Sequence, residues 1–153
     1  MQPVQSVAII GAGNMGSGIA QKTAQEEFDV QMVDREAQWV ERGQSIIADF
    51  LSEAVERRIF SPQQVADIQG RITGVIGTEN TSPDTDLVIE AVFEDFDIKT
   101  AVFNALNEVC GDKTILASNT SSLSVNDLSA ASGRPDRFVG LHFFYHPAKN
   151  RLV

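Results

Sequence analysis

A cluster of three glycines near the N-terminus could bind a phosphate group through the backbone. A buried apolar run, residues 7–10, breaks there into the segment Gly11-Ala-Gly13-Asn14-Met15-Gly16. In a strand-to-helix turn of this spacing, the first glycine allows the tight turn and the second lets a pyrophosphate approach, while the third lets the helix pack on the strand. The helix N-terminus would add free N–H groups and partial positive charge. The motif predicts dinucleotide binding, with a purely structural glycine turn as the alternative.

An acid closes the next apolar run. Asp34 follows Gly11 by 23 residues, close to the spacing of about 20 residues at which an acidic side chain binds the adenosine ribose of a dinucleotide. Its carboxylate would repel the 2′-phosphate of NADP, and an acid bonded to the ribose leaves no room for that phosphate although Arg35 follows. We therefore predict NAD as the cofactor.

A second group of ionisable residues surrounds a later strand end. Residues 86–92 form an apolar run that contains Glu90 and leads into Glu94. Because the carboxyl ends of parallel strands face the ligand crevice, Glu94 is the better candidate for a ligand contact, and Glu90 for a structural acid bonded to nearby backbone. Lys99, one turn into the following helix, could pair with Glu94 across the cofactor. An ordinary lysine on the helix surface is the alternative.

Small polar residues and a histidine follow the last two expected strands. Asn119 and Ser121 begin a run that would supply hydrogen-bonding groups without bulk, and we expect both to contact the ligand. We assign Ser122 and Ser124 to turn and helix-cap chemistry. His142 stands where the sixth strand should leave the sheet, beside the crevice. It could act as a general base there, and a structural histidine in the core is the alternative.

The hydropathy pattern predicts how these residues are positioned. Apolar runs alternate with helical segments, as in a parallel sheet covered on both faces. We expect an α/β fold with a Rossmann-like, doubly wound, mostly parallel sheet. Its strands are predicted over residues 5–10, 29–33, 71–76, 86–92, 114–118 and 137–143.

Two of the expected helices have clear apolar stripes, which predict core packing. The first helix, residues 14–25, carries Ile19, Ala20, Thr23 and Ala24 on its stripe. A later helix, beginning near Asp95 and ended by Gly111, carries Ile98, Val102, Phe103, Leu106 and Val109.

The segment from about 37 to 70 is too long for a simple crossover. It predicts a helix over 37–59 and then a shorter helix. Ser61 is a good N-cap for the second helix, Pro62 suits its first position, and Gln64 could complete a capping box. We therefore expect a helical hairpin inserted after the second strand.

Charge and composition narrow the range of partners. The 153 residues carry a formal net charge of −9, which argues against nucleic acid or an anionic membrane surface as the main partner. The densest basic spot, Arg57 with Arg58, is either a solvated helix end or a phosphate contact for a large anionic substrate. A single cysteine, Cys110, indicates no disulfide framework, so a reducing cytoplasm is the simplest location. No signal peptide, membrane span or metal-ligand spacing is expected.

Four motifs carry a resemblance to a known family. They are Gly11-Ala-Gly-Asn-Met-Gly-Ser-Gly18, the run from Asp86 through Glu94, Ala117-Ser-Asn-Thr-Ser-Ser-Leu123, and Gly140-Leu-His-Phe-Phe144. Together they resemble the NAD-binding domain of the 3-hydroxyacyl-CoA dehydrogenases. The resemblance spans essentially the whole chain, so residues 1–153 are expected to form one NAD-binding domain. Four motifs in the right order are far more specific than the glycine motif alone.

The resemblance implies a reaction and roles for single residues. The activity implied is oxidation of (3S)-3-hydroxyacyl-CoA to 3-oxoacyl-CoA with hydride transfer to NAD, in fatty acid β-oxidation or a related pathway. His142 would be the general base for the 3-hydroxyl, and Ser121 would hydrogen-bond the reacting oxygen. Asp34, Glu94, Lys99 and Ser121 are implied to contact NAD. With the glycine turn and Asn119, the expected cofactor-binding set is Gly11, Gly13, Asn14, Met15, Gly16, Asp34, Glu94, Lys99, Asn119 and Ser121.

The resemblance also implies that the hairpin touches the CoA portion of the substrate. Arg57 matches a lysine that the family uses for CoA, whereas Phe50 replaces a serine. The competing interpretation is a non-catalytic NAD-binding or structural protein of the same fold. A relative of the 3-hydroxy acid or 6-phosphogluconate dehydrogenases would share the glycine motif, but the serine-rich run and His-Phe-Phe favour the acyl-CoA family.

Two departures from the family pattern affect these expectations. Tyr145 stands where the family has an asparagine expected near the nicotinamide. The chain ends at Val153, one position before the glutamate that orients the catalytic histidine in the family. The C-terminal helical domain, through which the full-length protein would form a homodimer, follows in the family. We therefore expect this polypeptide to bind NAD but to turn over slowly, because a histidine without an acidic partner loses orientation and charge stabilisation.

Overall fold

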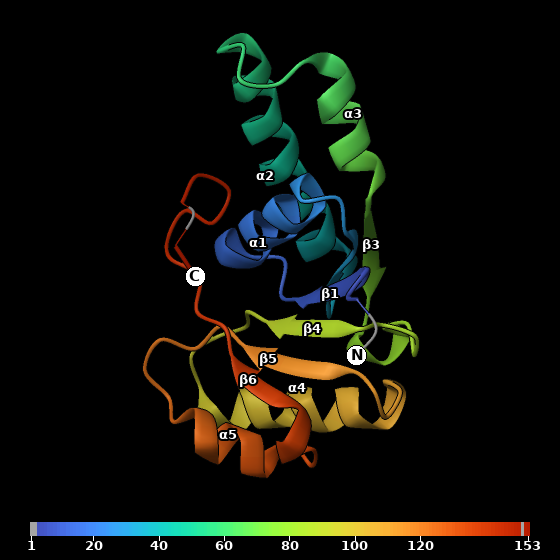
Figure 1. Cartoon of the computed structure of the whole chain (residues 1–153), viewed down its shortest axis with the longest axis vertical. Coiled ribbons are helices and arrows are strands. Elements are labelled where there is room, and N and C mark those ends of the chain that lie inside the picture. The colour runs from blue at the N-terminus through green and yellow to red at the C-terminus, as the bar shows by residue number, and fades with distance from the viewer. Residues whose placement is uncertain (1–2, 151) are drawn as a thin grey trace.

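The computed structural model describes residues 3–150 and 152–153 and has a six-stranded parallel sheet at its centre (Figure 1). The strands lie in the order β3-β2-β1-β4-β5-β6, and all five pairings are parallel. Their bounds are β1 Ser6–Ile10, β2 Asp29–Asp34, β3 Ile72–Ile76, β4 Leu87–Glu90, β5 Ile115–Ser118 and β6 Phe138–Gly140. The strand order reverses between β1 and β4, which is the topological switch point of the sheet. The expected doubly wound α/β fold is confirmed.

Helices cover both faces of the sheet (Figure 1). Their bounds are α1 Asn14–Gln25, α2 Ala37–Glu56, α3 Pro62–Gly70, α4 Phe96–Val109 and α5 Val125–Ala131, with short 3₁₀ turns at Thr78–Asn80 and Pro135–Arg137. Alternate residues of β1 point to opposite faces, so Ile9 packs with α1 and α2, and Ile10 packs with α4 and α5. The sheet therefore separates two apolar cores.

Three elements end earlier than the apolar pattern indicates. The strand expected over 86–92 stops at Glu90, because the Glu90 carboxylate accepts a hydrogen bond from the Val92 N–H and turns the chain. The strand expected over 137–143 stops at Gly140, where its partner β5 also ends. The helix expected to reach residue 59 ends at Glu56, since Arg58 adopts a left-handed conformation with φ of 57°.

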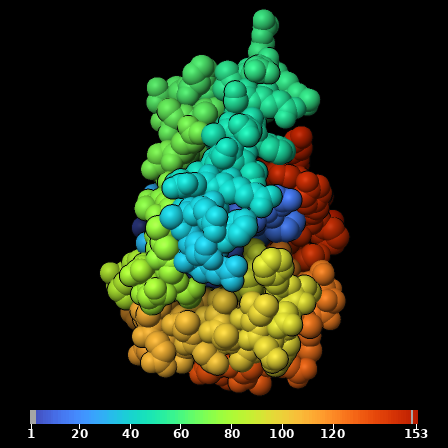
Figure 2. Space-filling view, turned by 180° about the vertical axis from the view of Figure 1, so that it is seen from behind, coloured from blue at the N-terminus to red at the C-terminus, as the bar shows by residue number. Residues whose placement is uncertain are grey.

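The α2–α3 pair follows β2. Ile47 and Leu51 of α2 pack into the core, and the far end of the pair projects from the rest of the molecule (Figure 2). The expected capping box at the start of α3 is present: Ser61 Oγ accepts from the Gln64 N–H, and the Gln64 side chain accepts from the Ser61 N–H. Midway along α2, the Phe50 ring stacks on His146 from the C-terminal loop at 4.3 Å between centroids. This contact joins α2 to the segment that follows His142.

Candidate functional site

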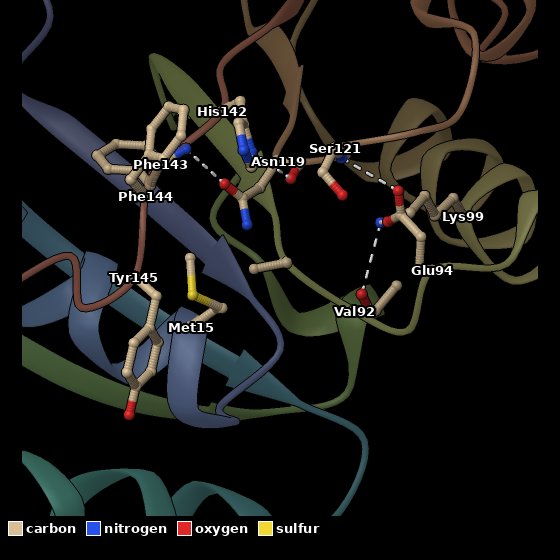
Figure 3. A pocket seen from close by; sticks show the side chains of 11 residues that line it. Met15, Val92, Glu94, Lys99, Asn119, Ser121, His142, Phe143, Phe144 and Tyr145 are labelled. Atoms are coloured by element: carbon tan, nitrogen blue, oxygen red, sulfur yellow. Dashed lines mark hydrogen bonds and ion pairs between the residues drawn. The ribbon is translucent and has the colours of Figure 1, made fainter. Parts of the chain in front are cut away.

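A cavity of about 320 Å³ lies at the carboxyl ends of β4 and β5, beside the start of α1. Figure 3 shows Asn119, Ser121 and His142 on one side of it, Glu94 and Lys99 on another, and Met15 and Tyr145 on a third. Its lining residues are Met15, Ala91, Val92, Glu94, Lys99, Asn119, Ser121, His142, Phe143, Phe144 and Tyr145. Six sequence-predicted site residues therefore meet at one cavity.

The three glycines of the turn have distinct steric environments. Gly11 adopts a φ of 104°, and a Cβ there would lie 2.7 Å from the Ala91 carbonyl oxygen. A Cβ on Gly16 would lie 1.7 Å from the Gly11 carbonyl oxygen, so helix and turn are in direct backbone contact. Gly13 has no atom within 4 Å of its Cβ position and is exposed. Close packing at two glycines and open space at the second are what a bound pyrophosphate requires.

The N-terminus of α1 is left without a side-chain cap. Gly13 is its N-cap residue and offers no oxygen, whereas Ser61, Asp95 and Ser124 cap α3, α4 and α5. The first N–H groups of a helix carry partial positive charge and bind anions well. The start of α1 thus fits the phosphates of a dinucleotide, and Asn14 and Met15 stand in its first turn.

Asp34 lies at the carboxyl end of β2, next to the glycine turn. Its Oδ2 accepts a hydrogen bond of 2.8 Å from the Ala12 N–H, and its Oδ1 accepts one from the Arg35 N–H. The carboxylate therefore stabilises the turn and remains half-exposed. A carboxylate at this position also fits the ribose hydroxyls of the adenosine half of NAD.

Lys99 is buried, so the surface-lysine interpretation is wrong. Its side chain is 1% exposed, and Nζ lies 2.6 Å from Glu90 Oε1 and 3.2 Å from Glu94 Oε2. Glu90 is fully buried, and its Oε1 also accepts from the Val92 N–H at 2.7 Å. The prediction of a structural acid bonded to nearby backbone is confirmed for Glu90. Lys99 contacts Glu94 directly rather than across a ligand.

Glu94 anchors the loop that follows β5. Its Oε1 accepts hydrogen bonds from the Thr120 hydroxyl, from the Ser121 N–H at 3.1 Å, and from the Ser122 N–H and hydroxyl. Partial burial alone would raise the pKa of Glu94, but the bonds from Thr120, Lys99 and Ser122 lower it to about 2. The carboxylate is thus ionised at neutral pH and fixes the backbone that carries Ser121.

Asn119 connects this loop to His142. The Asn119 side-chain oxygen accepts a 2.8 Å hydrogen bond from the Phe143 N–H. The backbone carbonyl oxygen of Asn119 lies 3.4 Å from His142 Nδ1. The imidazole also packs against the Phe144 ring at 4.8 Å between centroids. His142 is half-buried and lies beyond the end of β6 rather than inside the strand. These contacts orient the imidazole with respect to Ser121 and the cavity.

Arg57 does not lie at the cavity. It is the C-cap residue of α2, its guanidinium is 2.6 Å from Glu53 Oε1, and its side chain is 63% exposed. Phe50, on the same helix, is covered by the His146 ring and by Lys149, whose Nζ lies 4.5 Å from the Phe50 centroid. The α2–α3 pair therefore holds its basic end apart from the residues that surround His142.

Two features of the site escaped the sequence-based analysis. Thr120 is buried and bonded to Glu94, a residue 26 positions earlier that no local pattern could link to it. The burial of Lys99 had a readable signal: it shares a helical face with Phe103 and Leu106, which are also buried, whereas Ile98 is 43% exposed. Placing Ile98 on the buried stripe was wrong, because the stripe of α4 begins at Lys99.

Within residues 3–150 and 152–153, no group of three His, Cys, Asp or Glu side chains is arranged to hold a metal ion. None of the helices in that part of the chain combines the length and the apolarity that crossing a membrane requires.

Comparisons with known proteins give concordant results. The family model described as "3-hydroxyacyl-CoA dehydrogenase, NAD binding domain" matches residues 6–153. A 3-hydroxybutyryl-CoA dehydrogenase of Clostridioides difficile is 37% identical over 147 residues, covering 96% of this chain and 52% of the relative. A fatty acid oxidation complex subunit alpha of Psychrobacter is 36% identical over 141 residues, covering 92% of this chain and 20% of the relative.

Solved structures agree. The crystal structure of a (S)-3-hydroxybutyryl-CoA dehydrogenase from Ralstonia eutropha superposes with a TM-score of 0.89 at 37% identity, covering 93% of this chain and 50% of that one. The chain thus spans about half the length of the dehydrogenases that it matches.

Proposed function

The chain belongs to the NAD-binding domain family of the 3-hydroxyacyl-CoA dehydrogenases, and we propose that it serves the oxidation of a (3S)-3-hydroxyacyl-CoA to the 3-oxoacyl-CoA. One observation carries the proposal: His142, Ser121 and Asn119 converge on one cavity next to a glycine turn that fits a dinucleotide. A general base, a hydroxyl donor and a cofactor site at one cavity suit the removal of hydride and proton from a secondary alcohol.

The residues of this chain would share the binding of NAD between two sides. The open space at Gly13 and the uncapped start of α1 would take the pyrophosphate, and Asp34 would take the adenosine ribose. The other nucleotide would then extend toward β4 and β5, where Glu94, Lys99 and Ser121 line the cavity. A nicotinamide bound there would supply the acceptor for the hydride from C3 of the substrate.

His142 would take the proton of the 3-hydroxyl as the hydride leaves C3. With its Nδ1 proton directed at the Asn119 carbonyl oxygen 3.4 Å away, the Nε2 lone pair is free to accept that proton. Ser121 would donate a hydrogen bond to the reacting oxygen. No carboxylate bonds to His142 within the part of the chain that the structure describes. We therefore expect slow turnover by these 153 residues alone.

A basic residue at the end of α2 would bind the CoA portion of the substrate. Arg57 would contact a phosphate of CoA, in competition with its present partner Glu53. The pathway proposed is fatty acid β-oxidation or a related acyl-CoA pathway, in line with the name of the Psychrobacter relative.

A titration of the purified chain with NADH, and with NADPH in parallel, tests the cofactor site. We expect saturable binding that prefers NADH, followed by NADH formation from NAD and (3S)-3-hydroxybutyryl-CoA. His142→Gln should abolish the turnover and keep the affinity for NADH. Equal turnover by the His142→Gln variant would contradict a catalytic role, and turnover of the unchanged chain at ordinary dehydrogenase rates would contradict the expected effect of the missing acidic partner.

A further inference from the structure

A carboxylate lies buried inside the sheet, beneath the cavity. Glu90 is the last residue of β4, its exposure is 0%, and it pairs in register with Ile10 of β1 and Ser118 of β5. It is absent from the cavity lining. An ionised group at such a position is strongly destabilising unless other groups satisfy it. Its partners therefore indicate what the buried charge holds in place.

The partners of Glu90 use both of its carboxylate oxygens. Oε1 accepts from Lys99 Nζ at 2.6 Å and from the Val92 N–H at 2.7 Å. Oε2 accepts from the Ser118 hydroxyl at 2.7 Å. These three donors come from α4, from the turn after β4 and from the end of β5. Glu90 thus ties together three segments that surround the cavity.

Lys99 has no N–H group left over. An ammonium has three donors, and Lys99 Nζ faces Glu90 Oε1 at 2.6 Å, Glu94 Oε2 at 3.2 Å and the Val92 carbonyl oxygen at 3.4 Å. The three acceptors surround the nitrogen of a side chain that is 1% exposed. Lys99 therefore transmits the position of Glu90 to Glu94 in this arrangement, rather than presenting a free donor to a ligand.

Two routes lead from Glu90 to the same loop. Through Ser118, whose hydroxyl oxygen accepts from the Thr120 N–H at 3.2 Å, Glu90 fixes the backbone on either side of Asn119. Through Lys99 it holds Glu94, which accepts from the Ser121 N–H. Residues 118–122, with their ligand-facing side chains, are thus held from both ends by one buried carboxylate.

We propose that Glu90 is a positioning residue that sets the geometry of the nicotinamide side of the site through Ser118 and Lys99. The inference rests on the proposed function, because it requires that the cofactor extend from the glycine turn toward β5. The adenosine side has its own hydrogen bonds: Asp34 accepts from the Ala12 and Arg35 N–H groups, and within the described residues its carboxylate makes no hydrogen bond with Glu90, Lys99 or Ser118. Loss of Glu90 should therefore affect one half of the dinucleotide selectively.

The test compares NADH with ADP-ribose, which lacks the nicotinamide. Glu90→Gln keeps the shape of the side chain but removes the charge that Lys99 and Ser118 contact. We expect the affinity for NADH to fall about tenfold and the affinity for ADP-ribose to stay within about twofold of the unchanged chain. The blue shift of NADH emission on binding should also shrink, since it reports the surroundings of the nicotinamide. A merely structural role would weaken both ligands equally.

A milder pair of variants covers the case in which Glu90→Gln fails to fold. Ser118→Ala removes one 2.7 Å bond to Glu90 at the carboxyl end of β5. The matched control is Thr114→Val, which removes a 2.7 Å bond from a buried hydroxyl to Thr85 O just before the amino end of the same strand. We expect Ser118→Ala to weaken NADH about threefold, and Thr114→Val to leave both ligands unchanged.

The outcomes separate this inference from the proposed function. If the unchanged chain binds neither NADH nor ADP-ribose, the proposed cofactor site is wrong, and the role of Glu90 falls with it. If the unchanged chain binds both, but the Glu90 and Ser118 variants weaken neither or weaken both equally, the cofactor site stands and the positioning role is overturned.

Discussion

The two halves of the site are built in opposite ways. The half around β1, β2 and α1 depends on missing side chains: Gly11 and Gly16 allow backbone to touch backbone, and Gly13 leaves open space. The half around β4, β5 and α4 depends on a buried cluster of charged and polar side chains centred on Glu90 and Lys99. Close backbone packing defines the first half, and buried charges define the second. Substitutions in the two halves should therefore reduce stability and binding for different physical reasons.

This contrast has a functional logic. A pyrophosphate is recognised by backbone N–H groups that need close approach, and a side chain there would only obstruct it. A redox centre instead needs donors held in a fixed geometry, which packed and hydrogen-bonded neighbours provide. Glu90 holds loop 118–122 without lining the cavity itself. The glycine turn can therefore keep its shape when residues of the Glu90 cluster are substituted.

The largest effect is expected where shape leaves no freedom. In Gly16→Ala the new methyl group would lie 1.7 Å from the Gly11 carbonyl oxygen, and backbone on both sides prevents relief. We expect the free energy of unfolding to fall by more than about 3 kcal/mol, leaving little folded chain in a urea titration followed by circular dichroism. Gly70→Ala is the control, because its Cβ would meet nothing within 4 Å. A Gly16→Ala chain as stable as the Gly70→Ala chain would contradict the contact.

Substitutions in the half around Glu90 and Lys99 should lower stability because they leave a buried charge unpaired, not because of steric overlap. Lys99→Met removes the cation beside Glu90 and Glu94 and leaves a buried carboxylate unpaired. We expect a loss of about 3 kcal/mol in the free energy of unfolding, measured by the same titration. The double variant Glu90→Gln/Lys99→Met removes both buried charges and should recover part of that loss, but not the affinity for NADH. A Lys99→Met chain whose free energy of unfolding equals that of the unchanged chain would show that the Lys99–Glu90 ion pair does not stabilise the fold.

Binding can be separated from stability at the second glycine. Gly13 has a φ of −73° that alanine adopts readily, and space is open around its Cβ position. Gly13→Ala should change the free energy of unfolding by less than about 1 kcal/mol, yet weaken NADH about tenfold or more, because the methyl group would occupy the path of the pyrophosphate. Calorimetric titration with NADH and with ADP-ribose checks this, and both ligands should weaken together. Unchanged affinity would mean that the phosphates bind elsewhere.

The same contrast explains how much could be predicted from the sequence. The tight glycine turn and the position of Asp34 at the next strand end could be predicted because both depend on local spacing along one β-α-β unit. The sheet and the capping box at Ser61 were also readable, since periodicity and caps are local signals. The bonds that Glu90 makes with Ser118, and Glu94 with Thr120, join residues 28 and 26 positions apart, so only the folded arrangement reveals them. The strand expected over 86–92 was overextended because the Glu90 carboxylate accepts a hydrogen bond from the Val92 N–H and turns the chain while the residues are still apolar.

The smallest effect is expected outside both halves, where His146 from the segment after His142 stacks on Phe50 of α2. Burial and the nearby Lys149 cation lower the pKa of His146 from its ordinary value of about 6.5. Because the folded chain resists protonation of this imidazole more than the unfolded chain does, the stack stabilises the protein fully above pH 6.5. That contribution should decline as the pH falls below 6.5 toward the lowered pKa.

Thermal unfolding between pH 8 and pH 5 measures this effect, with His146→Phe keeping an aromatic ring against Phe50 but nothing to titrate. We expect the free energy of unfolding of the unchanged chain to fall from pH 8 to pH 5, by less than any substitution above lowers it. In His146→Phe the fall over the same pH range should be smaller still. His142→Gln serves as the control, since it removes the other histidine and leaves the stack in place. If the two variants respond identically to pH, the stack of His146 on Phe50 contributes no pH-dependent stability.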